Sequence, residues 1–132
     1  MKLTRFEDIQ AWQESRTLVK LVYDAVARSD AFAKDFRLVN QIQGAAVSAM
    51  SNIAEGFSRG GNKEFVQFLF ISKASAAEVQ SQLYVALDQG YIGKSQFDQI
   101  YAQADTVSRL VSAFIKYLRS QLSKPKQLKQ PK

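Results

Sequence analysis

Cysteine and histidine are both absent from the 132-residue chain. The missing cysteines exclude disulfides, thiolate metal sites and cysteine nucleophiles, and the missing histidines remove the commonest general base and metal ligand. Carboxylates are the only plausible catalytic groups left, and they do not cluster in the sequence. We therefore expect neither an enzyme nor a bound cofactor. The weaker alternative is a magnesium site built from carboxylates, with the candidates Glu55, Glu78, Asp98 and Asp105.

Proline, glycine and long apolar runs are also scarce. With only two prolines and six glycines, the chain has few residues that form turns or end helices, which favours a few long helices. No stretch approaches the roughly 20 apolar residues of a membrane span, and the first residues lack the apolar core of a signal peptide. We expect a cytoplasmic protein with no membrane association.

Apolar residues recur at helical spacing in four segments, at about 7–28, 36–58, 63–89 and 95–122. We predict an all-α, antiparallel up-down-up-down four-helix bundle over residues 1–123, followed by a flexible basic tail at 124–132. The expected capping residues are a Thr4–Glu7 capping box, Asp35, Asn62 and Ser95, and Gly90 is expected just past the end of the third helix. The predicted buried seam of the first helix is Ile9, Trp12, Arg16, Val19, Tyr23 and Val26.

Polar residues form one stripe on the second helix and another on the third. Because these two helices are joined by a short turn, the stripes are expected to face each other. They form either a hydrogen-bonded layer that fixes the register of the bundle or a subunit contact. The stripes are Gln41, Ser48, Asn52 and Glu55, and Ser72, Ser75, Glu78 and Gln82.

Aromatic residues are more numerous than one small core needs. Several fall off the predicted seams, and a helix that is apolar on more than one face more often marks oligomerisation than base stacking. These aromatics are Phe6, Phe32, Phe36, Phe70, Tyr84, Tyr91, Tyr101 and Tyr117.

Charge is distributed unevenly along the chain. Residues 1–105 carry 11 basic and 12 acidic side chains, whereas residues 106–132 carry seven basic side chains and no acid. This asymmetry indicates an anionic partner, either nucleic acid or an anionic membrane surface; alternatively, the basic end serves only solubility. Arg59 and Lys63 are weaker candidates beside Gly60-Gly61 and a helix start. The main candidates for phosphate contacts are Lys116, Arg119, Lys124, Lys126, Lys129 and Lys132.

Several motifs occur in an order that resembles a known family. These are the start from Phe6 to Gln13, the string Asn52-Ile53-Ala54-Glu55-Gly56, and the run from Ser75 through Glu78 to Leu83. Together they resemble the four-helix bundle proteins encoded in intervening sequences of bacterial 23S rRNA genes, also labelled S23 ribosomal protein-like. One departure is Ala74 before Ser75, where the family tends to have glycine. The family signature positions, interpreted as structural or interface groups, are Trp12, Gln41, Asn52, Glu55, Gly56, Ser75 and Glu78.

The resemblance implies a non-enzymatic bundle that assembles as a ring-like homo-oligomer, with a pentamer as the first guess. The fold also resembles the accessory protein of diversity-generating retroelements, a basic pentamer thought to bind nucleic acid and a reverse transcriptase. Our functional hypothesis is a ring-forming adaptor that binds nucleic acid, with RNA favoured, through its basic C-terminal surface. The alternative is a protein–protein scaffold or accessory subunit whose basic tail serves only solubility.

Overall fold

The computed structural model describes residues 3–122, and every regular element in that range is helical. The prediction of an all-α fold is confirmed. Residues 124–132, the predicted tail, lie outside the described range. The elements are the 3-10 helix η1 (Phe6–Asp8) and the α-helices α1 (Gln10–Ala27), α2 (Asp30–Lys34), α3 (Phe36–Ser58), α4 (Asn62–Asp88) and α5 (Lys94–Leu122).

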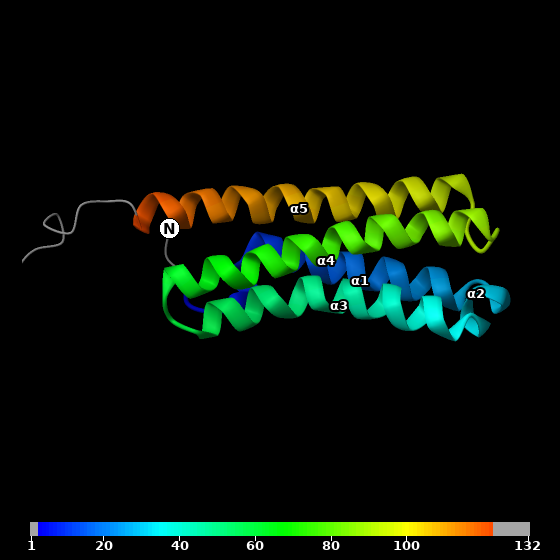
Figure 1. Cartoon of the computed structure of the whole chain (residues 1–132), viewed down its shortest axis with the longest axis horizontal. Coiled ribbons are helices and arrows are strands. Elements are labelled where there is room, and N and C mark those ends of the chain that lie inside the picture. The colour runs from blue at the N-terminus through cyan, green and yellow to red at the C-terminus, as the bar shows by residue number, and fades with distance from the viewer. Residues whose placement is uncertain (1–2, 123–132) are drawn as a thin grey trace, which may run out of the picture.

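The four long helices pack around one apolar core. Helix α4 packs between α3 and α5, while α1 also contacts both α3 and α5, so each long helix has two long neighbours. The start of α1, the α3–α4 connection and the end of α5 lie at one end of the bundle, and α2 and the α4–α5 connection lie at the other (Figure 1). Among residues 3–122, no helix is long and apolar enough to cross a membrane.

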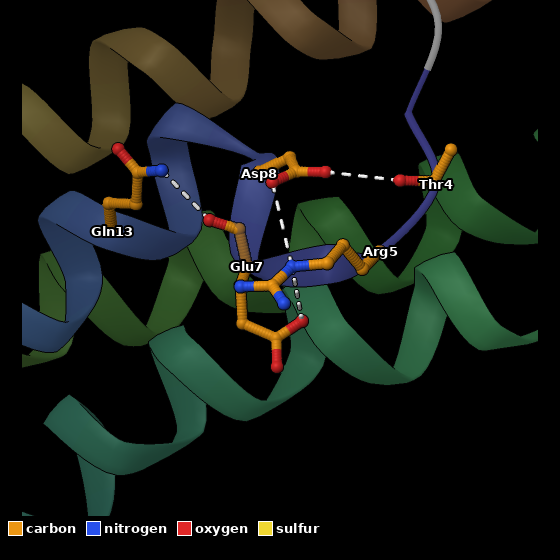
Figure 2. A network of polar contacts seen from close by, with 5 residues as sticks. All are labelled: Thr4, Arg5, Glu7, Asp8 and Gln13. Carbon is orange, nitrogen blue, oxygen red and sulfur yellow. Dashed lines mark hydrogen bonds and ion pairs between the residues drawn. The ribbon is translucent and has the colours of Figure 1, made fainter.

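Helix α1 begins later than predicted, and the expected capping box does not form. Thr4 donates from its hydroxyl to the Asp8 carboxylate at 3.3 Å, and the Arg5 guanidinium lies 3.6 Å from Asp8 and 3.7 Å from Glu7 (Figure 2). The Gln13 amide donates to the Glu7 carbonyl at 2.8 Å. These local contacts hold the chain in η1, so the α-helix starts only at Gln10.

The predicted seam of α1 is confirmed at its ends, where Ile9 and Val26 are buried, but the middle of the buried face is rotated from it. Leu18 and Val22 are fully buried, whereas Arg16 is exposed and Tyr23 is 45% exposed. The predicted seam runs through Trp12, Val19 and Tyr23, but Leu18 and Val22 offer a second, overlapping apolar face. The core instead takes this neighbouring face, on which the small residues Ala11 and Ser15 are buried together with Leu18 and Val22.

The connection predicted at residues 29–34 contains the short helix α2. The Ser29 hydroxyl caps this helix by accepting from the Phe32 amide at 3.1 Å. Phe32, which was expected to lie off the core, is 1% exposed and stacks on Tyr91 with ring centroids 5.2 Å apart. Helix α2 therefore closes one end of the core with an aromatic pair.

The other predicted helix boundaries are partly confirmed. Asp35 caps α3 by accepting from the Leu38 amide at 3.2 Å, and Gly90 follows α4 with a φ of +76°. The proposed caps Asn62 and Ser95 are wrong, because α4 has Gly61 at its N-cap and α5 already begins at Lys94. In these two cases the backbone turn, without a capping side chain, ends one helix and starts the next.

Candidate nucleic-acid and subunit interfaces

Part of the two polar stripes meets between α3 and α4. The Ser48 and Ser75 hydroxyls lie 2.8 Å apart, and the Asn52 amide donates to the Ser48 hydroxyl at 3.0 Å. The buried Ser72 hydroxyl donates to the Ala49 carbonyl at 2.7 Å. These bonds fix the register of the two helices, since sliding either helix would leave buried polar groups without partners.

The remaining stripe residues do not join this layer. Gln41, Glu55 and Glu78 are exposed to solvent. The Gln82 side chain is half-buried, and its Oε1 atom is buried with no hydrogen-bond partner in the described part of the chain. The sequence therefore identified the stripes, but only their serines and Asn52 form the inter-helix layer.

Gly56 marks a close approach of α3 to α4. A Cβ atom at this position would lie 2.7 Å from Phe65 Cδ1 and 2.8 Å from Phe68 Cβ. Phe65 is itself held by edge-on contacts with Phe57 and Phe114. The glycine of the Asn-Ile-Ala-Glu-Gly string is therefore a packing requirement. Trp12, another signature residue, is half-buried and packs edge-on against Phe6.

Arg59, predicted as a weaker phosphate contact, is held by the protein itself. Its guanidinium lies 3.0 Å from Glu55 and 3.5 Å from Glu64, and it sits 4.9 Å from the centre of the Phe68 ring. Two carboxylates offset its charge, so it is poorly suited to bind phosphate. Glu55 has a structural role here, because it ties the end of α3 to the turn before α4.

The other basic candidates gather at one end of the bundle. A hollow of about 440 Å³ is lined jointly by the α3–α4 connection and by Leu118 and Gln121 of α5. Lys63 is exposed in the first turn of α4, and Lys116 is exposed near the end of α5. The Arg119 guanidinium lies 5.0 Å from the centre of the Phe70 ring. The candidates that lie outside the described residues are Lys124, Lys126, Lys129 and Lys132.

The carboxylates considered for magnesium binding are separated from one another. Asp98 lies 2.7 Å from the Lys94 ammonium, Asp105 lies 3.2 Å from the Arg109 guanidinium, and Glu55 is held by Arg59. Within residues 3–122, no three acidic side chains gather where they could hold a metal ion. Each of these acids has a local cation as its partner, except Glu78.

An exposed apolar face on α4 is the feature that sequence reasoning identified only in part. Phe70 and Tyr84 were noted, but Ile71 and Val85, which are 47% and 45% exposed, were missed. The signal was present in the sequence, because apolar or small residues occupy a second face of this helix at spacings of 3 and 4. Solvent-facing helices normally carry charge there, so this face points to a protein contact.

The architecture and surfaces define a small all-α bundle protein with a basic end and a helical face that carries little charge. The model of the family described as 23S rRNA-intervening sequence protein matches residues 7–113, and the chain belongs to this family. Its fold is similar to a crystal structure of a protein of unknown function from the S23 ribosomal protein family of Bacteroides thetaiotaomicron. The TM-score is 0.72 at 21% sequence identity, over 80% of this chain and 98% of that one. No curated protein matches the chain.

Proposed function

We propose that this protein is a non-catalytic, ring-forming adaptor that binds nucleic acid, preferentially RNA, in the cytoplasm. The observation that carries the proposal is the charge distribution. Seven basic side chains and no acid occupy residues 106–132, while the rest of the chain has a net charge of −1. The end of α5, which carries Lys116 and Arg119, lies at the same end of the bundle as the start of α4, which carries Lys63 (Figure 1). Membership of a family named for rRNA intervening sequences favours RNA as the partner.

The binding surface would work through charge. Lysine side chains contact phosphates without reading bases, so affinity should be largely independent of sequence and should fall steeply with salt. Lys116 is exposed and forms no ion pair within residues 3–122, which leaves its charge available. Arg59 contributes little, because Glu55 and Glu64 already hold it.

Assembly is the second part of the proposal. The bundle, with its helices running alternately up and down, would be the subunit of a ring, with a pentamer as the first guess. Several basic ends on one particle would raise a weak contact per subunit to useful affinity through avidity. Native mass spectrometry of the purified protein tests this directly, and a single mass of one chain at micromolar concentration would overturn it.

RNA binding is tested by titration against a structured RNA and a DNA duplex at 50 and 200 mM salt. The variant replaces Lys124, Lys126, Lys129 and Lys132 with glutamine. The matched control replaces four lysines elsewhere, Lys20, Lys34, Lys73 and Lys94, with the same change in net charge. We expect the first variant alone to weaken binding and to lower the log–log salt slope by about three. Equal effects of the two variants would defeat the C-terminal assignment, and no binding by the wild type at low salt would defeat RNA binding itself.

A protein–protein scaffold is the second candidate, and the uncharged α4 face favours it. If the purified chain is monomeric, this face stays uncovered, and a different protein becomes its natural occupant. The basic end would then serve solubility alone.

A further inference from the structure

The outer side of α4 is almost free of charge over five helical turns. Between Gln67 and Val85, nine residues are exposed, and Glu78 is the only charged one among them. By contrast, the exposed positions of α5 carry a charge on nearly every turn. We call the exposed apolar residues of this face the α4 ridge: Phe70, Ile71, Ala74, Ala77, Tyr84 and Val85.

A complementary depression lies on the opposite side of the bundle. A hollow of about 410 Å³ opens between α1 and α3, where its lining includes Trp12, Met50 and Ala54. We call it the α1–α3 hollow. One turn beyond Trp12, Arg16 is exposed and forms no ion pair or hydrogen bond within residues 3–122, and the same holds for Glu78 on the ridge. Glu78 is thus an unpaired carboxylate on the ridge and Arg16 an unpaired cation beside the hollow, while Lys73 flanks the ridge and the Arg119 guanidinium of α5 lies over Phe70.

The ridge and the hollow also lie at matching heights along the bundle. The bonds from Ser48 to Ser75 and from Ser72 to Ala49 set the register of antiparallel α3 and α4. By this register Ala54 is about level with Phe70, within one helical turn of about 5 Å. Helices α1 and α4 begin at the same end of the bundle (Figure 1). Arg16, one turn past the hollow, is therefore about level with the stretch of α4 that leads to Glu78.

We propose that the α4 ridge of one copy docks into the α1–α3 hollow of the next, with Phe70 entering the hollow and Glu78 facing Arg16 of the neighbouring copy. The inference rests on the proposed ring assembly. A ring joins two different surfaces of the same molecule, and rotation about an axis along the bundle keeps each residue at its height. A two-fold contact of α4 with α4 would instead bring two Glu78 carboxylates together, which is unfavourable.

The area available suits a stable subunit contact. The ridge runs from Phe70 to Val85, or about 24 Å of helix, and together with the flanks of α3 and α5 it is about 20 Å wide. This gives about 500 Å² per copy, or about 1,000 Å² for the two partners together, which is the lower end of the range for specific interfaces. Two such contacts per subunit would close a ring.

Charge reversal and a steric block test the contact in the intact chain. Ala74→Arg places a long cation in the middle of the ridge, and the matched control Ala102→Arg alters an exposed alanine of α5. We expect A74R alone to reduce the native mass to one chain, with the circular dichroism of both variants unchanged. E78R and R16E should each raise the concentration needed for assembly at least about tenfold, and the double variant E78R/R16E should restore most of the loss.

Cross-linking gives a readout that does not depend on weakening the assembly. Because the chain has no cysteine, the double variant R16C/E78C carries the only two thiols. Helices α1 and α4 are diagonal in the bundle, so a short bismaleimide should join different copies and give a ladder of multimers. The control pair R16C/A102C should give none. A monomeric wild type would overturn both the ring and this contact. An assembled wild type in which A74R keeps the native mass, or R16C/E78C gives no ladder, would overturn the contact alone.

Discussion

The replacement Gly56→Ala sets two physical effects against each other. In a helix interior, alanine is favoured over glycine by about 1 kcal/mol, because glycine has more backbone freedom to lose. In α3, however, the new Cβ would lie 2.7 Å from Phe65 Cδ1 and 2.8 Å from Phe68 Cβ. Phe68 Cβ is fixed to its backbone and cannot swing away, so α3 and α4 must separate by several tenths of an ångström.

The magnitude follows from the packing. Overpacking of this kind costs typically about 1–3 kcal/mol, and separating the helices also strains the nearby Ser72–Ala49 hydrogen bond. After the gain in helix propensity, we expect a net loss of about 1–2 kcal/mol. For a chain of this length, the loss corresponds to a fall in melting temperature of roughly 4–8 °C.

Gly44→Ala is the matched control in the same helix. Gly44 is exposed, and a Cβ atom there would meet nothing within 4 Å. Only the propensity gain remains, so we expect the melting temperature to rise by roughly 2–4 °C. Thermal melts at one fixed protein concentration, followed by circular dichroism, measure both effects. A Gly56→Ala protein as stable as Gly44→Ala would refute the close-packing argument.

Three further changes test the polar contacts, each by urea unfolding. Asp35→Ala removes the cap of α3, which accepts from the Leu38 amide, and should cost about 1–2 kcal/mol, whereas Asp35→Asn should retain most of it. Tyr91→Phe removes the 2.9 Å hydrogen bond that the Tyr91 hydroxyl donates to the Asp35 carboxylate. In the wild type this bond raises the pKa of Tyr91 above its ordinary value of 10.0. The bond stabilises the fold fully at pH values below the ordinary pKa of tyrosine, and this stabilisation is lost as the pH rises through the raised pKa. The free energy of unfolding of the wild type should therefore exceed that of Y91F until the pH is strongly alkaline. Ser72→Ala removes the bond to the buried Ala49 carbonyl and should cost about 1 kcal/mol, with a neutral result contradicting its role in register.

Helix positions were predictable because the periodic signal extends over whole segments. The predicted segment 36–58 coincides with α3, and Asp35 and Gly90 were recognised because cap and turn chemistry is local. The rotation of α1 was not predictable by the same means. Its sequence offers two overlapping apolar faces, and only the packing partners select between them. Thr4 and Glu7 failed as a capping box because Asp8 and Arg5 compete for the same groups.

The candidate site was only partly predictable for a related reason. The sequence shows that Arg59 follows Glu55 by four positions, yet the third partner, Glu64, comes from the next helix. Such a network neutralises a cation that would otherwise count as a phosphate contact. The α4 ridge was recognised only through Phe70 and Tyr84, because apolar residues on two faces of one helix make the exposed face hard to separate from the buried one.

Assembly through the α4 ridge and RNA binding by the basic end are linked in this proposal. In a ring formed by the α4 ridge and the α1–α3 hollow, cyclic symmetry points every subunit the same way. The end of α5 and the start of α4, which carries Lys63, then lie on one rim, whereas a two-fold axis across the bundle would send them to opposite sides. Disassembly alone should therefore weaken RNA binding, even with every lysine intact. The A74R variant should bind RNA more weakly than A102R, although both carry the same added positive charge. Equal binding by the two variants would show that the basic end acts one subunit at a time.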